Sequence, residues 1–168
     1  MEGWDSPSAR RDLARKVIET YTAREQKIVT AESCTGGLLA AALTEISGSS
    51  AVVERGFIVY SNEAKIEMLG VKPELLNRFG AVSEEVAEAI AQGALEFSHA
   101  DVAVSITGIA GPTGATPGKP VGLVCFALAT RAGTTFHYPR QFNGSRDDVR
   151  LRSVHEALQL LLAQSQPQ

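Results

Sequence analysis

The run "DVAVSITGI" at residues 101–109 constrains the fold most strongly, because almost all of its side chains are apolar. A strand with one face in water alternates apolar and polar residues, so a continuous apolar run predicts a strand buried on both faces. Such strands occur in α/β proteins, where helices cover both sides of the sheet. The sequence therefore predicts a central sheet between two helical layers.

The other segments agree with this architecture. β-branched and aromatic residues predict further strands at 27–31, 52–60, 123–130 and 134–142, with "RAG" as a hairpin turn between the last two and Gly56 as a weak point. Helical periodicity predicts helices at 5–25, 36–47, 61–70, 72–80, 83–98 and 143–164. This order predicts a three-layer α/β/α sandwich with a mixed, mostly parallel central sheet and an antiparallel edge hairpin.

The expected helix ends have recognisable signals. Ser6, Ser83 and Ser145 each precede a helical pattern and are expected to be N-caps. Pro7 suits the first helical position, and Gly70 suits the end of the helix at 61–70. These signals predict where the helices begin and end.

Length and composition indicate one globular domain. A chain of 168 residues with 44% hydrophobic and 21% charged residues can bury one full core, so we expect a single domain over residues 1–168. Residues 1–8 and 164–168 are expected to be frayed. The opening residues lack the apolar segment of a signal peptide, and no apolar run has membrane-spanning length. We therefore expect no membrane association.

Charge and cysteine content narrow the partners and the compartment. The formal net charge of −3 disfavours nucleic-acid binding by the whole surface. Cys34 and Cys125 form no CxxC pair, which favours free thiols in a reducing, cytoplasmic setting. No group of residues has metal-ligand spacing, so no metal site is expected.

Polar residues follow three of the predicted strands where each strand ends. They are Glu32 to Gly37, then Tyr60, Ser61, Asn62 and Lys65, then Ser105, Thr107 and Gly108. Ligands in open α/β sheets bind beyond the carboxyl ends of the strands. If the three strands are adjacent and parallel, these side chains converge in one pocket, with Asn62, Thr107 and Gly108 in contact with the ligand.

The stretch "AESCTGG" has both a chemical and a structural interpretation. Gly36 and Gly37 allow close approach of a ligand, and backbone N–H groups from Thr35 to Gly37 suit a phosphate or an oxyanion. Ser33 could then act as a nucleophile with a suitable base. In the structural interpretation, Ser33 or Thr35 only caps the next helix and the glycines only turn the chain. The residues alone leave both open.

Cys34 and Lys65 are the other reactive candidates. A thiolate at Cys34 would be favoured near a helix N-terminus, but no histidine is adjacent in sequence, and a buried structural thiol is the favoured role. Most lysines on helices are solvated. Lys65, however, follows a strand ending at Tyr60, and a desolvated lysine there has a lowered pKa and can act as a base. Ser33 and Lys65 together form a possible Ser-Lys pair.

Three arginines near the start of the last predicted helix have different expected roles. Arg146 lies close to the helix start. Its guanidinium could bind a phosphate with two hydrogen bonds, or it could belong to a solvated charged face, and the residues alone leave both open. Arg150 and Arg152 are expected to belong to a solvated charged face with Asp147 and Asp148. The glycine- and proline-rich segment at 107–122 is expected to be a loop, and its role stays open.

Taken together, the motifs resemble those of the CinA C-terminal domain family. The matching segments are "TAESCTGG", "GSSAVVERGFIVYSNEAKIEMLGV", "GAVSEEVAEAIAQGA", "ADVAVSITGIAGPTG", "KPVGLVCFAL" and "RDDVR". They occur in the family's order, and the resemblance extends from about Val17 to Leu162. The chain resembles the stand-alone, PncC-like form of the family, so activities of the separate N-terminal domain of longer members are not transferred.

This resemblance implies a nicotinamide mononucleotide amidohydrolase. The reaction gives nicotinate mononucleotide and ammonia in pyridine-nucleotide salvage, without metal or organic cofactor. It further implies that Ser33 is the nucleophile, that Lys65 is its general base, and that Tyr60 orients the pair or relays a proton. Thr107 and Arg146 would hold the substrate, Arg146 at its phosphate. Family habit and the hairpin edge favour a homo-oligomer, a dimer or larger.

Two other functions remain as alternatives. A nucleotide-binding regulatory module without chemistry could use the same glycine-rich turn and Arg146. A competence or DNA-damage factor is suggested only by the family's name, and the acidic charge balance argues against it.

Overall fold

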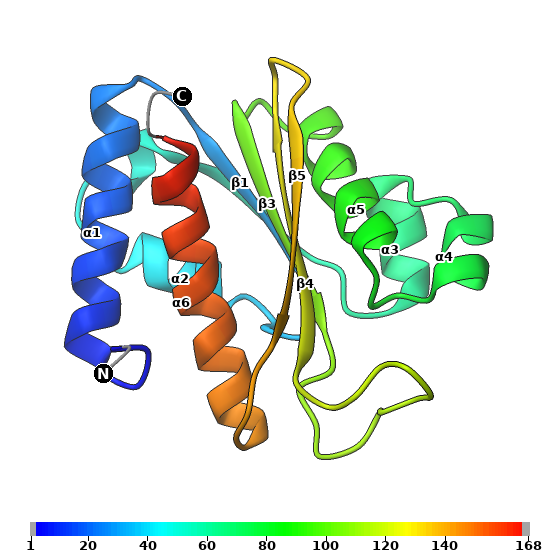
Figure 1. Ribbon diagram of the computed structural model, residues 1–168. Coiled ribbons are helices and arrows are strands. Elements are labelled where there is room, and N and C mark those ends of the chain that lie inside the picture. Colours follow the sequence, from blue (N-terminus) through cyan, green and yellow to red (C-terminus); the bar gives the residue numbers. More distant parts are fainter. Residues whose placement is uncertain (1–2, 166–168) are drawn as a thin grey trace.

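The computed structural model describes residues 3–165, which form a five-stranded sheet between two layers of helices (Figure 1). The expected α/β/α sandwich is confirmed. The strand order is β2-β1-β3-β4-β5. β1 pairs in parallel with β2 and β3, whereas β3–β4 and β4–β5 are antiparallel. The strands are β1 (Ile28–Glu32), β2 (Val53–Ile58), β3 (Val102–Gly108), β4 (Leu123–Thr130) and β5 (Thr135–Gln141).

Helices cover each face of the sheet. One layer consists of α1 (Pro7–Ala23), α2 (Leu38–Thr44) and α6 (Arg146–Gln164), and the other of α3 (Asn62–Leu69), α4 (Pro73–Phe79) and α5 (Glu84–Glu96). No helix within residues 3–165 combines the length and the apolar character needed to cross a membrane. The prediction of frayed ends falls partly on residues 1–2 and 166–168, which lie outside the described residues.

The helix starts follow the predicted caps. The hydroxyls of Ser6, Ser83 and Ser145 each accept a hydrogen bond from a backbone N–H in the first turn of α1, α5 and α6. At the start of α6, Asp148 also accepts from the backbone N–H of Ser145, which completes a capping box. This bond and one from the Ser145 hydroxyl lower the pKa of Asp148. The start of α6 is therefore firmly anchored.

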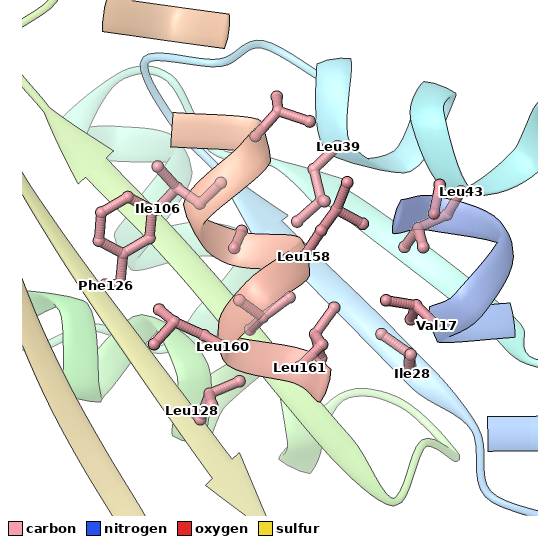
Figure 2. Close-up of a cluster of buried hydrophobic side chains, with 14 of the residues drawn as sticks. Val17, Ile28, Leu39, Leu43, Ile106, Phe126, Leu128, Leu158, Leu160 and Leu161 are labelled. Carbon is pink, nitrogen blue, oxygen red and sulfur yellow. The ribbon is translucent and has the colours of Figure 1, made fainter. Parts of the chain in front are cut away.

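Two apolar clusters hold the layers together, one on each face of the sheet. Figure 2 shows the first, in which leucines of α2 and α6 pack on side chains of β3 and β4. Its labelled members include Leu39, Leu43, Ile106, Phe126, Leu128, Leu158 and Leu161. The second cluster joins α5 to the opposite face through residues such as Val29, Ala31, Ile90 and Ala103. Because β1 and β3 contribute to both clusters, they are buried on both sides, as the apolar runs predicted.

Two predicted boundaries were wrong in ways that affect the site. β2 ends at Ile58, so Tyr60 belongs to the following loop and its side chain is 61% exposed. α2 begins at Leu38, because Gly36 and Gly37 have φ values of 58° and 102°, which place them in a left-handed turn. A short 3₁₀ helix at Ser49–Ala51 was not predicted. Gly56 does not interrupt β2, and a Cβ there would lie 2.8 Å from Thr30 Oγ1.

Candidate active site

A cavity of about 210 Å³ lies at the carboxyl ends of β1 and β3, beside the start of α3 and of α6. The parallel pairing of β1 with both neighbours brings these strand ends to the same edge of the sheet. The lining residues are Ser33, Cys34, Tyr60, Asn62, Lys65, Ala81, Val82, Thr107, Gly108, Ala110 and Arg146. Seven of the ten residues expected at the site therefore meet here, and Thr35, Gly36 and Gly37 do not line the cavity.

Ser33 and Lys65 lie side by side in this cavity. Lys65 Nζ is 3.1 Å from Ser33 Oγ. The backbone N–H of Ser33 donates to the carbonyl oxygen of Ile106, which fixes the residue between the ends of β1 and β3. Ser61 caps α3, and Lys65 follows one turn later. Helical side chains point back toward the helix start, so the lysine reaches the strand end from there.

The ammonium form of Lys65 is disfavoured by its surroundings. Only 1% of the residue is exposed, and burial lowers the pKa of its amine. Nζ also lies 2.8 Å from the carbonyl oxygen of Val59 and 3.1 Å from that of Tyr60. No carboxylate accepts a hydrogen bond from this amine among the described residues. Burial thus makes this amine easier to deprotonate than the amine of an exposed lysine.

Tyr60 and Arg146 stand together at the cavity. The Arg146 guanidinium donates to the Tyr60 hydroxyl at 3.1 Å and to the carbonyl oxygen of Gly111 at 2.8 Å. Arg146 is exposed, so its remaining N–H groups can reach a ligand from solvent. Three segments distant in sequence are joined here, namely the loop after β2, the loop after β3 and the start of α6.

The other lining residues differ in what their side chains can do. The Thr107 hydroxyl donates to the carbonyl oxygen of Ala81 at 2.8 Å, so it can still accept a hydrogen bond from a ligand. Asn62 is exposed at the first position of α3. Gly108 packs against Val124, and a Cβ there would lie 2.7 Å from its Cγ2 atom. Gly108 therefore contributes backbone and close packing.

The start of α2 binds a side chain of the protein itself. The buried carboxylate of Glu32 accepts from the backbone N–H of Leu39 at 2.9 Å and of Ala40 at 3.1 Å. It also accepts from the Thr35 hydroxyl at 2.7 Å. The N–H of Gly36 donates to the carbonyl oxygen of Ser33. These donors of the helix start are occupied by the protein itself, and sequence reasoning missed this role of Glu32.

Cys34 lines the cavity but is a poor nucleophile. Burial raises the pKa of its thiol to about 12, so the thiolate form is scarce near neutral pH. No histidine lines the cavity among the described residues, since His99, His137 and His155 lie elsewhere. Lys65 Nζ lies within hydrogen-bond distance of Ser33 Oγ, and its hydrogen bonds among the described residues do not include the thiol of Cys34.

Arg150 does not belong to a solvated charged face, contrary to the sequence-based expectation. Its side chain is 29% exposed and lies over the turn that follows β1. Nε donates to the carbonyl oxygen of Cys34 at 3.2 Å, and Nη2 lies 3.4 Å from that of Thr35. Arg152 stacks on Trp4 instead. The spacing of four residues between Arg146 and Arg150, which places both on one helix face, could have indicated this role.

Three larger cavities, of about 380, 400 and 360 Å³, are lined by no lysine among the described residues. In the first, Arg131 donates to the carbonyl oxygens of Leu95, Ser98 and Ala100, and thus ties loops together. In the second, Arg140 is paired with Glu156. Within residues 3–165, no group of three or more His, Cys, Asp or Glu side chains could hold a metal ion.

Comparisons with known proteins identify the family to which the chain is similar. The sequence model of the CinA C-terminal domain family matches residues 10–165. A nicotinamide-nucleotide amidohydrolase PncC from Escherichia coli is 51% identical over 152 residues, which cover 90% of this chain and 92% of that protein. A CinA-like protein from Mycolicibacterium gilvum is 58% identical over 134 residues, or 80% of this chain, and the matched part is only 32% of that longer protein.

Solved structures show the same fold. The crystal structure of the competence/damage inducible protein CihA from Agrobacterium tumefaciens aligns with a TM-score of 0.91 and 51% identity, and covers 94% of this chain and 96% of that one. A competence or damage-inducible protein from Enterobacter asburiae aligns with a TM-score of 0.90 and 38% identity, and covers 94% and 98% of the two chains.

Proposed function

The chain belongs to the CinA C-terminal domain family, and we propose that it is an amidohydrolase that converts nicotinamide mononucleotide into nicotinate mononucleotide and ammonia. The observation that carries the proposal is the distance of 3.1 Å between Ser33 Oγ and the buried Nζ of Lys65 in an open cavity. The name of the Escherichia coli relative, which this chain matches over most of both lengths, supports the substrate class. The reaction needs no metal or organic cofactor.

Lys65 acts as the general base in the first step. A neutral amine has two N–H donors and one lone pair. The carbonyl oxygens of Val59 and Tyr60, at 2.8 and 3.1 Å, accept the two N–H groups, which leaves the lone pair for the Ser33 hydroxyl. As Lys65 takes this proton, Ser33 Oγ attacks the carboxamide carbon and a tetrahedral intermediate forms.

The second half of the reaction returns the proton and releases ammonia. The Lys65 ammonium protonates the amide nitrogen as the C–N bond breaks, which leaves an ester on Ser33. Water then attacks the ester carbon and gives a proton to Lys65. Lys65 returns this proton to Ser33 Oγ as the C–O bond to Ser33 breaks, which restores the hydroxyl and the neutral amine. The products are nicotinate mononucleotide, with a carboxylate in place of the amide, and ammonia.

The positive charge of Lys65 also stabilises the intermediate. In our mechanism the ammonium forms beside the developing oxyanion, where low polarity strengthens the attraction. The N–H groups of Gly36, Leu39 and Ala40 are already bonded to Ser33 and Glu32, so they are not our choice of oxyanion donors.

The cavity fits the ring of the substrate rather than the whole nucleotide. Its volume of about 210 Å³ is below the usual size of a pocket that encloses a complete ligand. We place the pyridine ring and carboxamide inside, near Thr107 and Gly108, with Asn62 at the edge. The ribose phosphate extends toward Arg146, whose guanidinium is already oriented by Tyr60 and Gly111.

Ammonia release from nicotinamide mononucleotide tests the proposal directly. The purified chain should release one ammonia per nicotinate mononucleotide formed, with both products quantified. Arg146→Gln should raise KM for the mononucleotide more than for nicotinamide riboside, which lacks the phosphate. Arg11→Gln, on the exposed face of α1, is the matched control and should change neither value.

The same assay separates an enzyme from a nucleotide-binding module. Saturable binding of the mononucleotide without product would refute the enzymatic proposal and support the module.

A further inference from the structure

Arg150 binds the backbone of the turn that carries Ser33, although it lines no part of the cavity. Its Nε donates to the carbonyl oxygen of Cys34, the residue directly after Ser33, at 3.2 Å. Its Nη2 lies 3.4 Å from the carbonyl oxygen of Thr35. A guanidinium has a planar set of donors, so it can hold two neighbouring carbonyls in one fixed arrangement.

The remaining hydrogen bonds of the turn show why this contact matters. The carbonyl oxygen of Ser33 accepts from the N–H of Gly36, and that of Thr35 from the N–H of Leu38. The carbonyl oxygen of Cys34 is held by the Arg150 side chain. Loss of Arg150 therefore removes a donor to a largely buried carbonyl within one residue of Ser33, and such a group is costly to leave without a partner.

Arg150 and Arg146 lie one turn apart on the same helix. Arg146 donates to Tyr60 and Gly111 at the cavity, while Arg150 donates to the turn after β1. The capping box of Ser145 and Asp148 anchors this part of α6. Asp147 lies 3.9 Å from Arg150 Nη1, which adds a weak, exposed ion pair. The start of α6 thus contacts both the loops that carry Tyr60 and Gly111 and the turn that follows Ser33.

We propose that Arg150 is a positioning residue, which acts through the carbonyl oxygens of Cys34 and Thr35 to hold Ser33 Oγ against Lys65 Nζ. This inference rests on the proposed function. Arg150 does not contact the substrate, so its loss lowers kcat and leaves KM nearly unchanged.

The test compares Arg150→Gln, Arg150→Lys and the control Arg11→Gln in the full chain. Because a displacement of about 1 Å at a reacting atom can cost about 100-fold in rate, we expect Arg150→Gln to lower kcat by about 10- to 100-fold. KM should stay within about threefold, since the residue makes no substrate contact. Arg150→Lys keeps the charge and can still donate hydrogen bonds, but it lacks the planar guanidinium, so it should recover part of the lost rate. Arg11→Gln should behave as the native chain.

Hydrogen exchange provides a readout that does not depend on activity. The amides of Gly36 and Leu38 bond within the turn, so peptides spanning residues 33–40 should exchange faster in Arg150→Gln than in the native chain. Unchanged kcat, or a reduced kcat with unchanged exchange, would overturn the positioning role. If the native chain released no ammonia, the proposed function would fail instead, and exchange alone would decide whether Arg150 holds the turn.

Discussion

Two buried polar centres flank the end of β1, and they differ in what their side chains face. The first, which we call the Glu32 centre, consists of the Glu32 carboxylate, the Thr35 hydroxyl and the N–H groups of Leu39 and Ala40. The second, the Ser33–Lys65 centre, lies on the cavity. Residues adjacent in sequence thus supply the two centres from one strand end.

The comparison separates structural from chemical uses of a buried polar group. At the Glu32 centre, donors of the helix start and a hydroxyl surround the carboxylate, and none of these groups lines the cavity. This arrangement compensates the cost of burial and stabilises α2. At the Ser33–Lys65 centre, three backbone carbonyls and a hydroxyl surround an amine, and Ser33 lines the cavity. Only the second centre can exchange a proton with a ligand.

The largest expected effect is loss of activity at the Ser33–Lys65 centre. Ser33→Ala removes the attacking oxygen, so ammonia release should fall by about 1,000-fold or more, as is usual when a nucleophile is deleted. The Tm should change little, because the lost hydroxyl makes one contact. Turnover of the mononucleotide and a thermal melt measure the two effects.

A matched serine tests whether the loss is specific. Ser105→Ala removes a buried hydroxyl of β3 that donates to the carbonyl oxygen of Ala87 outside the cavity. It should lower stability by about 1 kcal/mol, the typical net value of a hydrogen bond, and retain turnover. Near-native turnover in Ser33→Ala would end the proposed mechanism.

A substitution at the Glu32 centre should lower stability and leave turnover largely unchanged. Glu32→Gln replaces one acceptor oxygen by an NH₂ group that faces other donors, so unfolding should become easier by about 2 kcal/mol. The folded fraction should keep most of its kcat, because Glu32 does not line the cavity. Denaturant titration and kcat at saturating substrate check this.

Glu45→Gln is the control for the lost charge, since Glu45 lies at the exposed C-terminal end of α2. It should change stability by less than about 0.5 kcal/mol. Equal losses in both glutamine variants would show that the Glu32 centre has no special structural role.

Lys65→Met should separate function from stability at a single residue. Turnover should be lost with the base. Because burial lowers the pKa of Lys65 in the folded state, the unfolded chain binds the proton more tightly, and folding at neutral pH is penalised. The free energy of unfolding should therefore rise with pH, from the pKa of Lys65 in the folded chain up to its pKa in the unfolded chain, about 10.4.

Methionine has no such penalty, so Lys65→Met should have a higher Tm than the native chain at pH 7. The difference in Tm between the two chains should become smaller as the pH approaches the pKa of lysine in the unfolded chain. Thermal melts at several pH values measure this difference. A lower Tm at neutral pH would mean that the carbonyls of Val59 and Tyr60 stabilise the ammonium more than burial disfavours it.

Much of the architecture was predictable because it depends on local patterns. The apolar runs of β1 and β3 identified central strands, and serine caps located the starts of α1, α5 and α6. The proximity of Ser33 and Lys65 followed from placing both at the carboxyl ends of parallel strands. These predictions needed only periodicity, capping and the topology of α/β sheets.

The functions of Glu32 and Arg150 were not predictable in the same way. Glu32 ends a strand and faces the N-terminus of α2 rather than the cavity, and the sequence does not show which way a residue at a strand end will point. Arg150 reaches a turn more than 100 residues away in the chain. Such long-range contacts depend on how α6 packs against the sheet, so the expected solvated face was wrong for this residue.

Substitution of Cys34 should have the smallest effect on turnover, although Cys34 is adjacent to Ser33 in the sequence. Burial raises the pKa of its thiol to about 12, and the hydrogen bonds of Lys65 go to Ser33 and to backbone carbonyls, so Cys34→Ala should change kcat by less than about threefold. In the native chain its alkylation by iodoacetamide at pH 8 should be slow compared with unfolded chain. If Cys34→Ala lost turnover and Ser33→Ala kept it, the thiol would be the nucleophile, and the position of Lys65 would need another explanation. Retained turnover in Cys34→Ala would instead support the Ser33 hydroxyl as the nucleophile. Both side chains line the cavity, and the hydroxyl of Ser33 is the one hydrogen-bonded to Lys65.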